Sequence, residues 1–130
     1  MSGVGPVHHV ALLVADLARA ERFYVEVLGL PVRTRHAESD GSPRSSWIDL
    51  GQDVFLALEK AEAAAPRRHA TGAGWHLVAL TIEASERERW RERLSRAGHP
   101  VLRETAFTLY AEDPDGNLVG LSHYPSAAPR

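Results

Sequence analysis

Two histidines occupy matching places in the sequence and could together bind a divalent metal. His9 lies fourteen residues before Phe23, and His76 lies fourteen residues before Trp90. Neutral imidazole is a good ligand for Zn, Fe, Ni and Mn, and a metal with open coordination positions could polarise a bound oxygen substrate. The alternative is that each histidine is a hydrogen-bonded residue of a core strand. The matched positions favour a shared metal site, but the residues alone allow both interpretations.

The histidine spacing belongs to a longer internal repeat. Each histidine starts an apolar stretch, which is followed by an amphipathic stretch and then by GLPV at 29–32 or GHPV at 98–101. A repeat of this length is typical of one supersecondary unit used twice around a shared core. We therefore expect a single domain with two similar modules, at about 7–60 and 74–124, joined by an Ala-rich linker over 61–73.

Composition limits the possible classes of protein. The chain has 130 residues, a formal net charge of -2 and no cysteine, which excludes disulfides, thiolate nucleophiles and Cys-ligated zinc. The charge gives no basic surface for nucleic acid, and no apolar run approaches the length of a membrane span. The first residues lack the pattern of an export signal. We expect a cytoplasmic protein with a small-molecule partner, without nucleic-acid or membrane partners.

Apolar periodicity predicts a strand, a helix and three strands in each module. The first helix is expected to begin after Asp16 as N-cap and to end before Gly29. The second is expected to begin with a capping box at Ser85 and Glu88 and to end before Gly98. The predicted strands are 7–14, 32–36, 46–50 and 54–58 in the first module, and 76–82, 101–104, 107–110 and 118–122 in the second. Turns are predicted at 51–53 and 113–117.

Four short motifs accompany this twice-used βαβββ unit: HVAL at 9–12, DL at 16–17, FY at 23–24 with LG at 28–29, and DPDGN at 113–117. With them the chain resembles the vicinal oxygen chelate superfamily over roughly 7–124. That superfamily is the group of glyoxalase I, extradiol dioxygenases, fosfomycin-resistance thiol transferases and bleomycin-binding proteins. The resemblance implies an α+β fold in which two tandem βαβββ modules form a curled mixed sheet around a cavity. It also implies a homodimer.

The resemblance assigns metal-ligand positions to the first and last strands of each module. The first-strand positions fall on His9 and His76, and the last-strand positions, usually carboxylates, fall on Ala57 and Gly120. Both acids are therefore missing, so a divalent metal would depend on the two imidazoles. Glu59 alternates onto the same strand face as Ala57 and is a possible substitute ligand, or else a solvated charge at a strand end.

Other side chains could serve a cavity in the same fold. Trp47 and Trp75 could line a pocket for a flat ligand, and Tyr110 is a candidate catalytic residue near the last strand. Asp49 alternates onto the face of Trp47, so it is either a buried acid with a raised pKa, suited to act as a general base, or a solvated charge. His8 should point away from His9. Three arginines could meet an anionic ligand or be surface charges: Arg33, Arg35 and Arg44.

Two functions from different classes follow. The first is an enzyme of the glyoxalase or dioxygenase type, with isomerase, lyase or oxygenase chemistry at a His-based divalent metal. The second is a metal-free ligand-binding or drug-sequestering protein, or a metal-independent enzyme, with the same fold. The histidine pair favours the first function, and Ala57 with Gly120 favours the second. The fold alone does not choose between them, because one fold can serve many functions.

Overall fold

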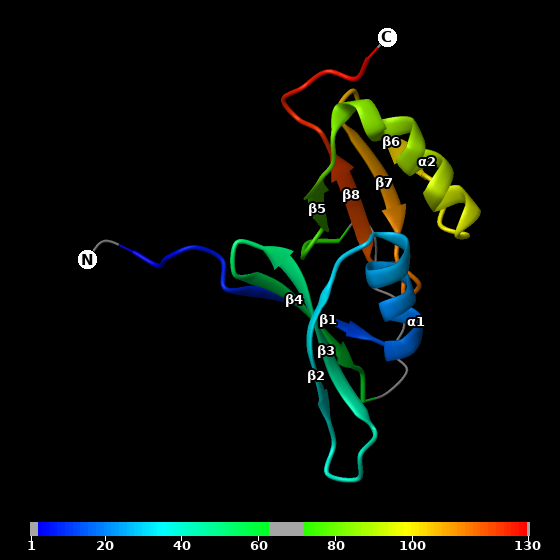
Figure 1. Cartoon of the computed structure of the whole chain (residues 1–130). Coiled ribbons are helices and arrows are strands. Elements are labelled where there is room, and N and C mark those ends of the chain that lie inside the picture. The colour runs from blue at the N-terminus through cyan, green and yellow to red at the C-terminus, as the bar shows by residue number, and fades with distance from the viewer. Residues whose placement is uncertain (1–2, 63–71, 130) are drawn as a thin grey trace. The chain divides into compact units, whose positions relative to one another are not determined.

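The computed structural model describes residues 3–62 and 72–129. The chain divides into two compact units, Met1–Ala65 and Pro66–Arg130, each of which contains one four-stranded sheet and its helix (Figure 1). Of the linker predicted over 61–73, residues 63–71 lie outside the described part of the chain.

The first unit contains a mixed sheet with the strand order β1-β4-β3-β2. Its strands are β1 (His9–Val14), β2 (Val32–Ala37), β3 (Pro43–Gly51) and β4 (Val54–Lys60). β1 runs parallel to β4, and the other neighbours are antiparallel. Helix α1 (Leu17–Glu21) begins at Asp16, whose carboxylate accepts a hydrogen bond from the Arg19 amide, as predicted. It continues as a π-helical segment, η1 (Arg22–Val27), where the sequence predicts an ordinary α-helix.

The second unit repeats this order as β5-β8-β7-β6. Its elements are β5 (Leu77–Thr81), the 3-10 turn η2 (Ala84–Glu86), α2 (Arg87–Arg96), β6 (Arg103–Glu104), β7 (Thr108–Glu112) and β8 (Leu118–Ser122). The predicted capping box is wrong: the N-cap of α2 is Glu86, one residue after Ser85, and it makes no side-chain cap hydrogen bond. Glu88 instead pairs with Arg91.

Both predicted turns are confirmed. The turn between β3 and β4 places Gln52 and Asp53 at φ values of 53° and 64°, which is the left-handed geometry of tight hairpins. In the turn between β7 and β8, the Asp113 carboxylate accepts hydrogen bonds from the amides of Asp115 and Asn117, at 2.9 and 2.8 Å. The α+β class and the two tandem modules are also confirmed, and the sheets are not closed into a barrel.

In the first unit, one face of the sheet packs against α1 and the opposite face stays partly open. Ile48 and Leu58 are fully buried, and Leu56 is 1% exposed, so these alternating side chains fill the interface with the helix. Each buried side chain of this size stabilises the fold by about 1.5–3 kcal/mol. The residues between them point to the other face, where Glu59 and Leu13 are exposed. That open face carries the candidate site.

No helix among the described residues is long and apolar enough to span a membrane.

Candidate ligand site on the first sheet

The open face of the first sheet is organised in rows that cross the strands. The register aligns His9, Phe55 and Asp49 in one row, Ala11, Ala57 and Trp47 in the next, and Leu13, Glu59 and Ser45 in the third. The middle row carries two alanines side by side, so the sheet floor is bare between taller neighbours. The result is a hollow of about 350 Å³, at the small end of ligand pockets.

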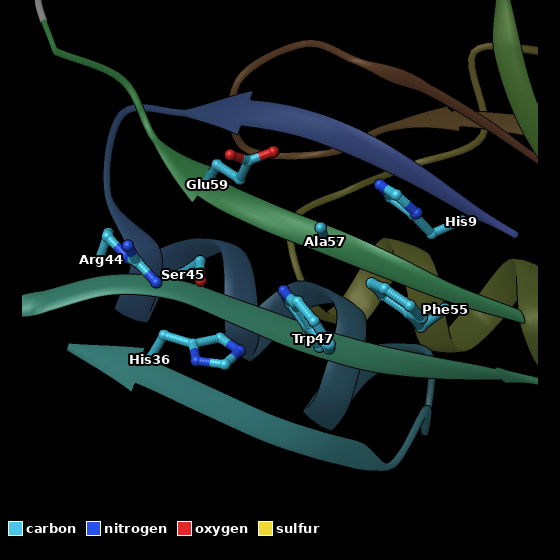
Figure 2. A pocket seen from close by; sticks show the side chains of 8 residues that line it. All are labelled: His9, His36, Arg44, Ser45, Trp47, Phe55, Ala57 and Glu59. Carbon is cyan, nitrogen blue, oxygen red and sulfur yellow. The ribbon is translucent and has the colours of Figure 1, made fainter.

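Figure 2 shows the hollow with the eight side chains that line it. They come from all four strands of the first sheet: His9, His36, Arg44, Ser45, Trp47, Phe55, Ala57 and Glu59.

A row of four rings forms one side of the hollow. Between ring centroids, His9 lies 4.8 Å from Phe55 with the planes 4° apart, and Phe55 lies 4.3 Å from Trp47 with the planes 19° apart. His36 then meets Trp47 edge-on at 4.7 Å. Stacked and edge-on rings support one another and lose little entropy on binding. The wall is therefore preformed for a flat or apolar partner.

The opposite end of the hollow is polar and lacks internal partners. The side chains of Arg44, Ser45 and Glu59 make no hydrogen bond or ion pair with any other described residue. Ser45 is only 7% exposed, and the Nε2 atom of His36 is buried without a partner in the described structure. Unpaired polar groups next to a hollow are places where a ligand can form hydrogen bonds.

Asp49 shares the face of Trp47, as the alternation predicts, but it turns toward the strand end. Its carboxylate lies 3.0 Å from the Arg33 guanidinium and accepts a hydrogen bond of 2.9 Å from the Gly51 amide. The Gly51 amide and Arg33 hold the pKa of Asp49 below its usual value. A buried general base would need the opposite shift. Arg33 also lies over the Phe55 ring, 5.2 Å from its centroid, so the Arg33–Asp49 pair supports the ring wall.

The surroundings of His9 differ from the sequence expectation in one respect. His8 was expected on the opposite face, yet its ring lies 5.8 Å from that of Phe55. Its Nδ1 is 2.9 Å from the Nδ1 of His9. The expectation for His8 is wrong because His8 precedes β1, where strict alternation does not apply. One ring nitrogen of His9 is thus engaged by a neighbouring imidazole.

The remaining predicted residues belong to the second unit. Trp75 and His76 precede β5 and are exposed, Trp75 by 89%. Tyr110 pairs in register with Gly120, and its ring lies under the Arg103 guanidinium at 4.4 Å. The structure thus brings His9 and Trp47 to one hollow, with Asp49 beside it.

The strand register differs by one residue from the repeat seen in the sequence. Ala11 pairs with Ala57 in the first sheet, and Ala79 pairs with Gly120 at the matching place in the second. Two residues before Ala11 is His9, and two residues before Ala79 is Leu77. The structural counterpart of His9 is therefore Leu77, and His76 lies one residue before it. The spacing to the helix misleads because η1 is π-helical and a 3-10 turn precedes α2. Equal sequence spacing therefore does not give equal positions on the two first strands.

The residues present do not fit a resident metal in either unit. Ala57 and Gly120 have no donor atom, and the described residues contain no group of three or more His, Asp or Glu that could hold an ion. A Cβ at Gly120 would lie 3.2 Å from Cγ2 of Thr108, so this position is also crowded.

Sequence reasoning missed three members of the site, Phe55, His36 and Ser45. Phe55, the centre of the ring wall, alternates with Ala57 and Glu59 along β4, so the period of two already indicated its face. His36 lies on β2 opposite Ser45. Its role could be inferred only from the pairing of β2 with β3, which a single sequence does not specify.

Residues 7–121 match the family model of the Glyoxalase/Bleomycin resistance protein/Dioxygenase superfamily, and the chain belongs to this superfamily. The resemblance drawn from the sequence is thereby confirmed.

Three relatives illustrate the similarity. The virulence protein STM3117 of Salmonella typhimurium is 29% identical over 125 residues, which cover 91% of this chain and 83% of the relative. A glyoxalase/dioxygenase from Nostoc punctiforme superposes with a TM-score of 0.75 at 20% identity, over 97% of this chain and 99% of that one. A mutant of the fosfomycin resistance protein FosX from Listeria monocytogenes, complexed with Mn(II) and 1S,2S-dihydroxypropylphosphonic acid, gives 0.71 at 18% identity, over 95% and 93%. At these identities the two crystal structures are similar in fold.

Proposed function

We propose that the hollow of the first sheet binds a small planar organic molecule without a resident metal ion. The observation that carries this proposal is the preformed wall of Phe55 and Trp47 beside the bare Ala57 floor. At that floor the superfamily resemblance would place a metal-binding carboxylate. A ligand ring stacked against Trp47 would gain a few kcal/mol at most from buried area and ring contact.

A tryptophan-fluorescence screen of small planar compounds tests this proposal. Trp47→Phe is the required control, because Trp75 and Trp90 also emit. We expect ligands that quench or shift the emission of the natural chain but not that of the variant. The proposal fails if every responding compound acts equally on both proteins.

The rival function is a metal-dependent enzyme of isomerase, lyase or oxygenase type, with His9 and His76 as ligands. It is favoured by the position of His9 in the hollow and by the Mn(II) in the FosX structure. Metal analysis of the purified chain, before and after treatment with a chelator, separates the two functions. A stoichiometric ion that only the chelator removes would support the rival and count against our proposal.

Four further predictions from the sequence accompany these functions. Catalytic roles for Asp49 and Tyr110 stay predictions, and Asp49→Asn would lower turnover while sparing binding if the acid is a base. A homodimer and a cytoplasmic location also stay predictions, and sedimentation velocity of the purified chain tests the former.

A further inference from the structure

We infer that the ligand of the hollow has a flat aromatic body and an ampholytic head, with a cationic donor and an anionic acceptor close together. The simplest compounds of this class are aromatic α-amino acids. This inference rests on the proposed function, because it describes the occupant of the same hollow.

The polar end of the hollow presents opposite charges that stay unpaired. Arg44 offers only donors and Glu59 only acceptors, and neither forms an ion pair with a described residue. Nearby charges on the same sheet behave differently. Arg33 pairs with Asp49 at 3.0 Å, and Arg35 pairs with Glu21 at 2.7 Å. Arg44 and Glu59, which line the hollow, are therefore available to a ligand, and Lys60 at the end of β4 is likewise without an ion pair to a described residue.

A serine hydroxyl belongs to the hollow beside these charges. Ser45 follows Arg44 in the chain, pairs in register with Glu59 and lines the hollow. Its side chain has no partner among the described residues. A ligand head that reaches the floor can therefore form a hydrogen bond with Ser45.

The combination of charges selects against singly charged ligands. An anionic head would be attracted by Arg44 but repelled by the Glu59 carboxylate. A cationic head would be attracted by Glu59 but repelled by the Arg44 guanidinium. Repulsion from an uncompensated like charge is a usual source of specificity. A head with both charges satisfies both side chains, and an aromatic body attached to it lies against Trp47 and Phe55.

Three compounds that share one indole ring but differ in the head test the inference. Tryptophan carries both charges, tryptamine lacks the carboxylate, and indole-3-propionate lacks the ammonium. Calorimetric titration of the full chain, supported by amide shifts of Ser45 and Ala57 in nuclear magnetic resonance spectra, gives the three affinities. We expect tryptophan to bind about tenfold or more tightly than either partner, since each extra bond is charge-assisted.

Variants assign each preference to a side chain. Arg44→Gln should remove the preference for tryptophan over tryptamine, and Glu59→Gln should remove the preference over indole-3-propionate. Trp47→Phe should weaken all three compounds by a similar factor. Arg35→Gln is the matched control, because Arg35 pairs with Glu21 of α1, away from the hollow, and all three affinities should stay unchanged.

The outcomes separate this inference from the proposed function. Equal affinities for the three compounds, or unchanged preferences in both charge variants, would overturn the ampholytic head while leaving ring binding intact. If no indole compound binds but the fluorescence screen finds a Trp47-dependent ligand, the inference falls and the proposed function stands. If neither experiment finds binding at Trp47, both fall.

Discussion

The two sheets share a central row and differ on both sides of it. Ala11, Ala57 and Trp47 in the first correspond to Ala79, Gly120 and Tyr110 in the second, two small residues beside one ring. The flanking rows have changed: His9, Phe55 and Asp49 correspond to Leu77, Leu118 and Glu112, and Leu13, Glu59 and Ser45 correspond to Thr81, Ser122 and Thr108.

The flanking rows of the two sheets differ in how their side chains are paired. In the second sheet the Thr108 hydroxyl donates to that of Ser122 at 2.9 Å, and the Thr108 methyl would be 3.2 Å from a Cβ at Gly120. In the first sheet Ser45 and Glu59 are not bonded to each other, and the space above Ala57 stays open. One duplicated framework thus carries a hollow on the first sheet and a hydrogen-bonded Thr108–Ser122 pair at the matching place on the second.

A buried arginine distinguishes the second unit further. Arg87 on α2 is 8% exposed. Its guanidinium donates to the Thr105 carbonyl at 2.8 Å and to the Glu104 carboxylate at 3.1 Å, and lies 2.8 Å from Nε2 of His123. Since His123 places its Nδ1 against the Ser126 carbonyl, Nε2 is the acceptor. The second unit therefore contains a buried cation that joins α2 to the segment 104–105 and to His123.

The largest effect on stability should come from removing this arginine. We expect Arg87→Met to lower the free energy of unfolding by about 1–3 kcal/mol, because the buried Nε2 of His123 loses a charged donor while the alkyl stem is kept. Urea denaturation measures the change. Arg89→Met is the matched control on the same helix, where an exposed pair with Glu86 should contribute less than about 0.5 kcal/mol. Equal effects would show that Arg87 does not support the second sheet.

The next effect concerns the acid missing from the central row. Gly120→Glu should lower the free energy of unfolding by about 1–3 kcal/mol, because the new side chain must displace the Thr108 methyl. Adding Thr108→Ser should recover part of this loss, since it removes Cγ2 and keeps the hydroxyl bond to Ser122. Thermal unfolding measures both variants.

Ala57→Glu is the corresponding change in the first sheet and should be tolerated better, because its carboxylate enters the hollow beside His9 and Glu59. It should also bind Mn(II) or Zn(II) more tightly than the natural chain in a calorimetric titration, since it adds an anionic oxygen ligand. If Gly120→Glu alone tightens metal binding without loss of stability, the expected difference between the hollow at Ala57 and the crowded position at Gly120 is wrong.

The sequence alone predicts the framework of both sheets better than their surfaces. Local features are predicted correctly where bonds within a few residues specify the backbone, as at Asp16, Gly29 and the turn at 113–117. The alignment of His9 with Leu77 could not be predicted in this way. A π-helical segment in one unit and a 3-10 turn in the other change the number of residues between the first strand and the helix. The site at Trp47 needs the cross-strand register, which long-range pairing determines.

Acid should act on the two units unequally. Arg91 and Arg87 lower the pKa of Glu104 from 4.5 to about 2. Folding is therefore favoured by this carboxylate above pH 4.5, and that contribution is lost as the pH falls from 4.5 toward 2. In the first unit, Arg35 and the Ser46 hydroxyl also lower the pKa of Glu21. Only one cation acts on Glu21, whereas two act on Glu104, so we expect the acid dependence due to Glu21 to be smaller.

We expect Glu104→Gln to flatten the acid dependence of the urea midpoint more than Glu21→Gln does. Midpoints at several pH values between 2 and 7 test this order. A steeper acid dependence in Glu104→Gln than in the natural chain would contradict the sign.

The smallest effect should come from the hairpins that follow the ring-bearing strands β3 and β7. In the first unit the turn places Asp53 at φ 64°, whereas the corresponding turn of the second unit uses Gly116 at φ 85°. Left-handed backbone costs a residue with a Cβ about 1 kcal/mol, and less for aspartate. Asp53→Gly should therefore raise the free energy of unfolding only slightly, by less than about 0.5 kcal/mol, because the extra chain entropy of glycine offsets most of the relieved strain. Gly116→Ala is the reciprocal change and should lower the free energy of unfolding by about 1 kcal/mol.

Parallel urea titrations of the two variants and the natural chain measure these changes in the free energy of unfolding. If Asp53→Gly instead destabilises the chain, the aspartate side chain stabilises the turn by more than its left-handed backbone costs. The two hairpins would then differ in how their turns are stabilised.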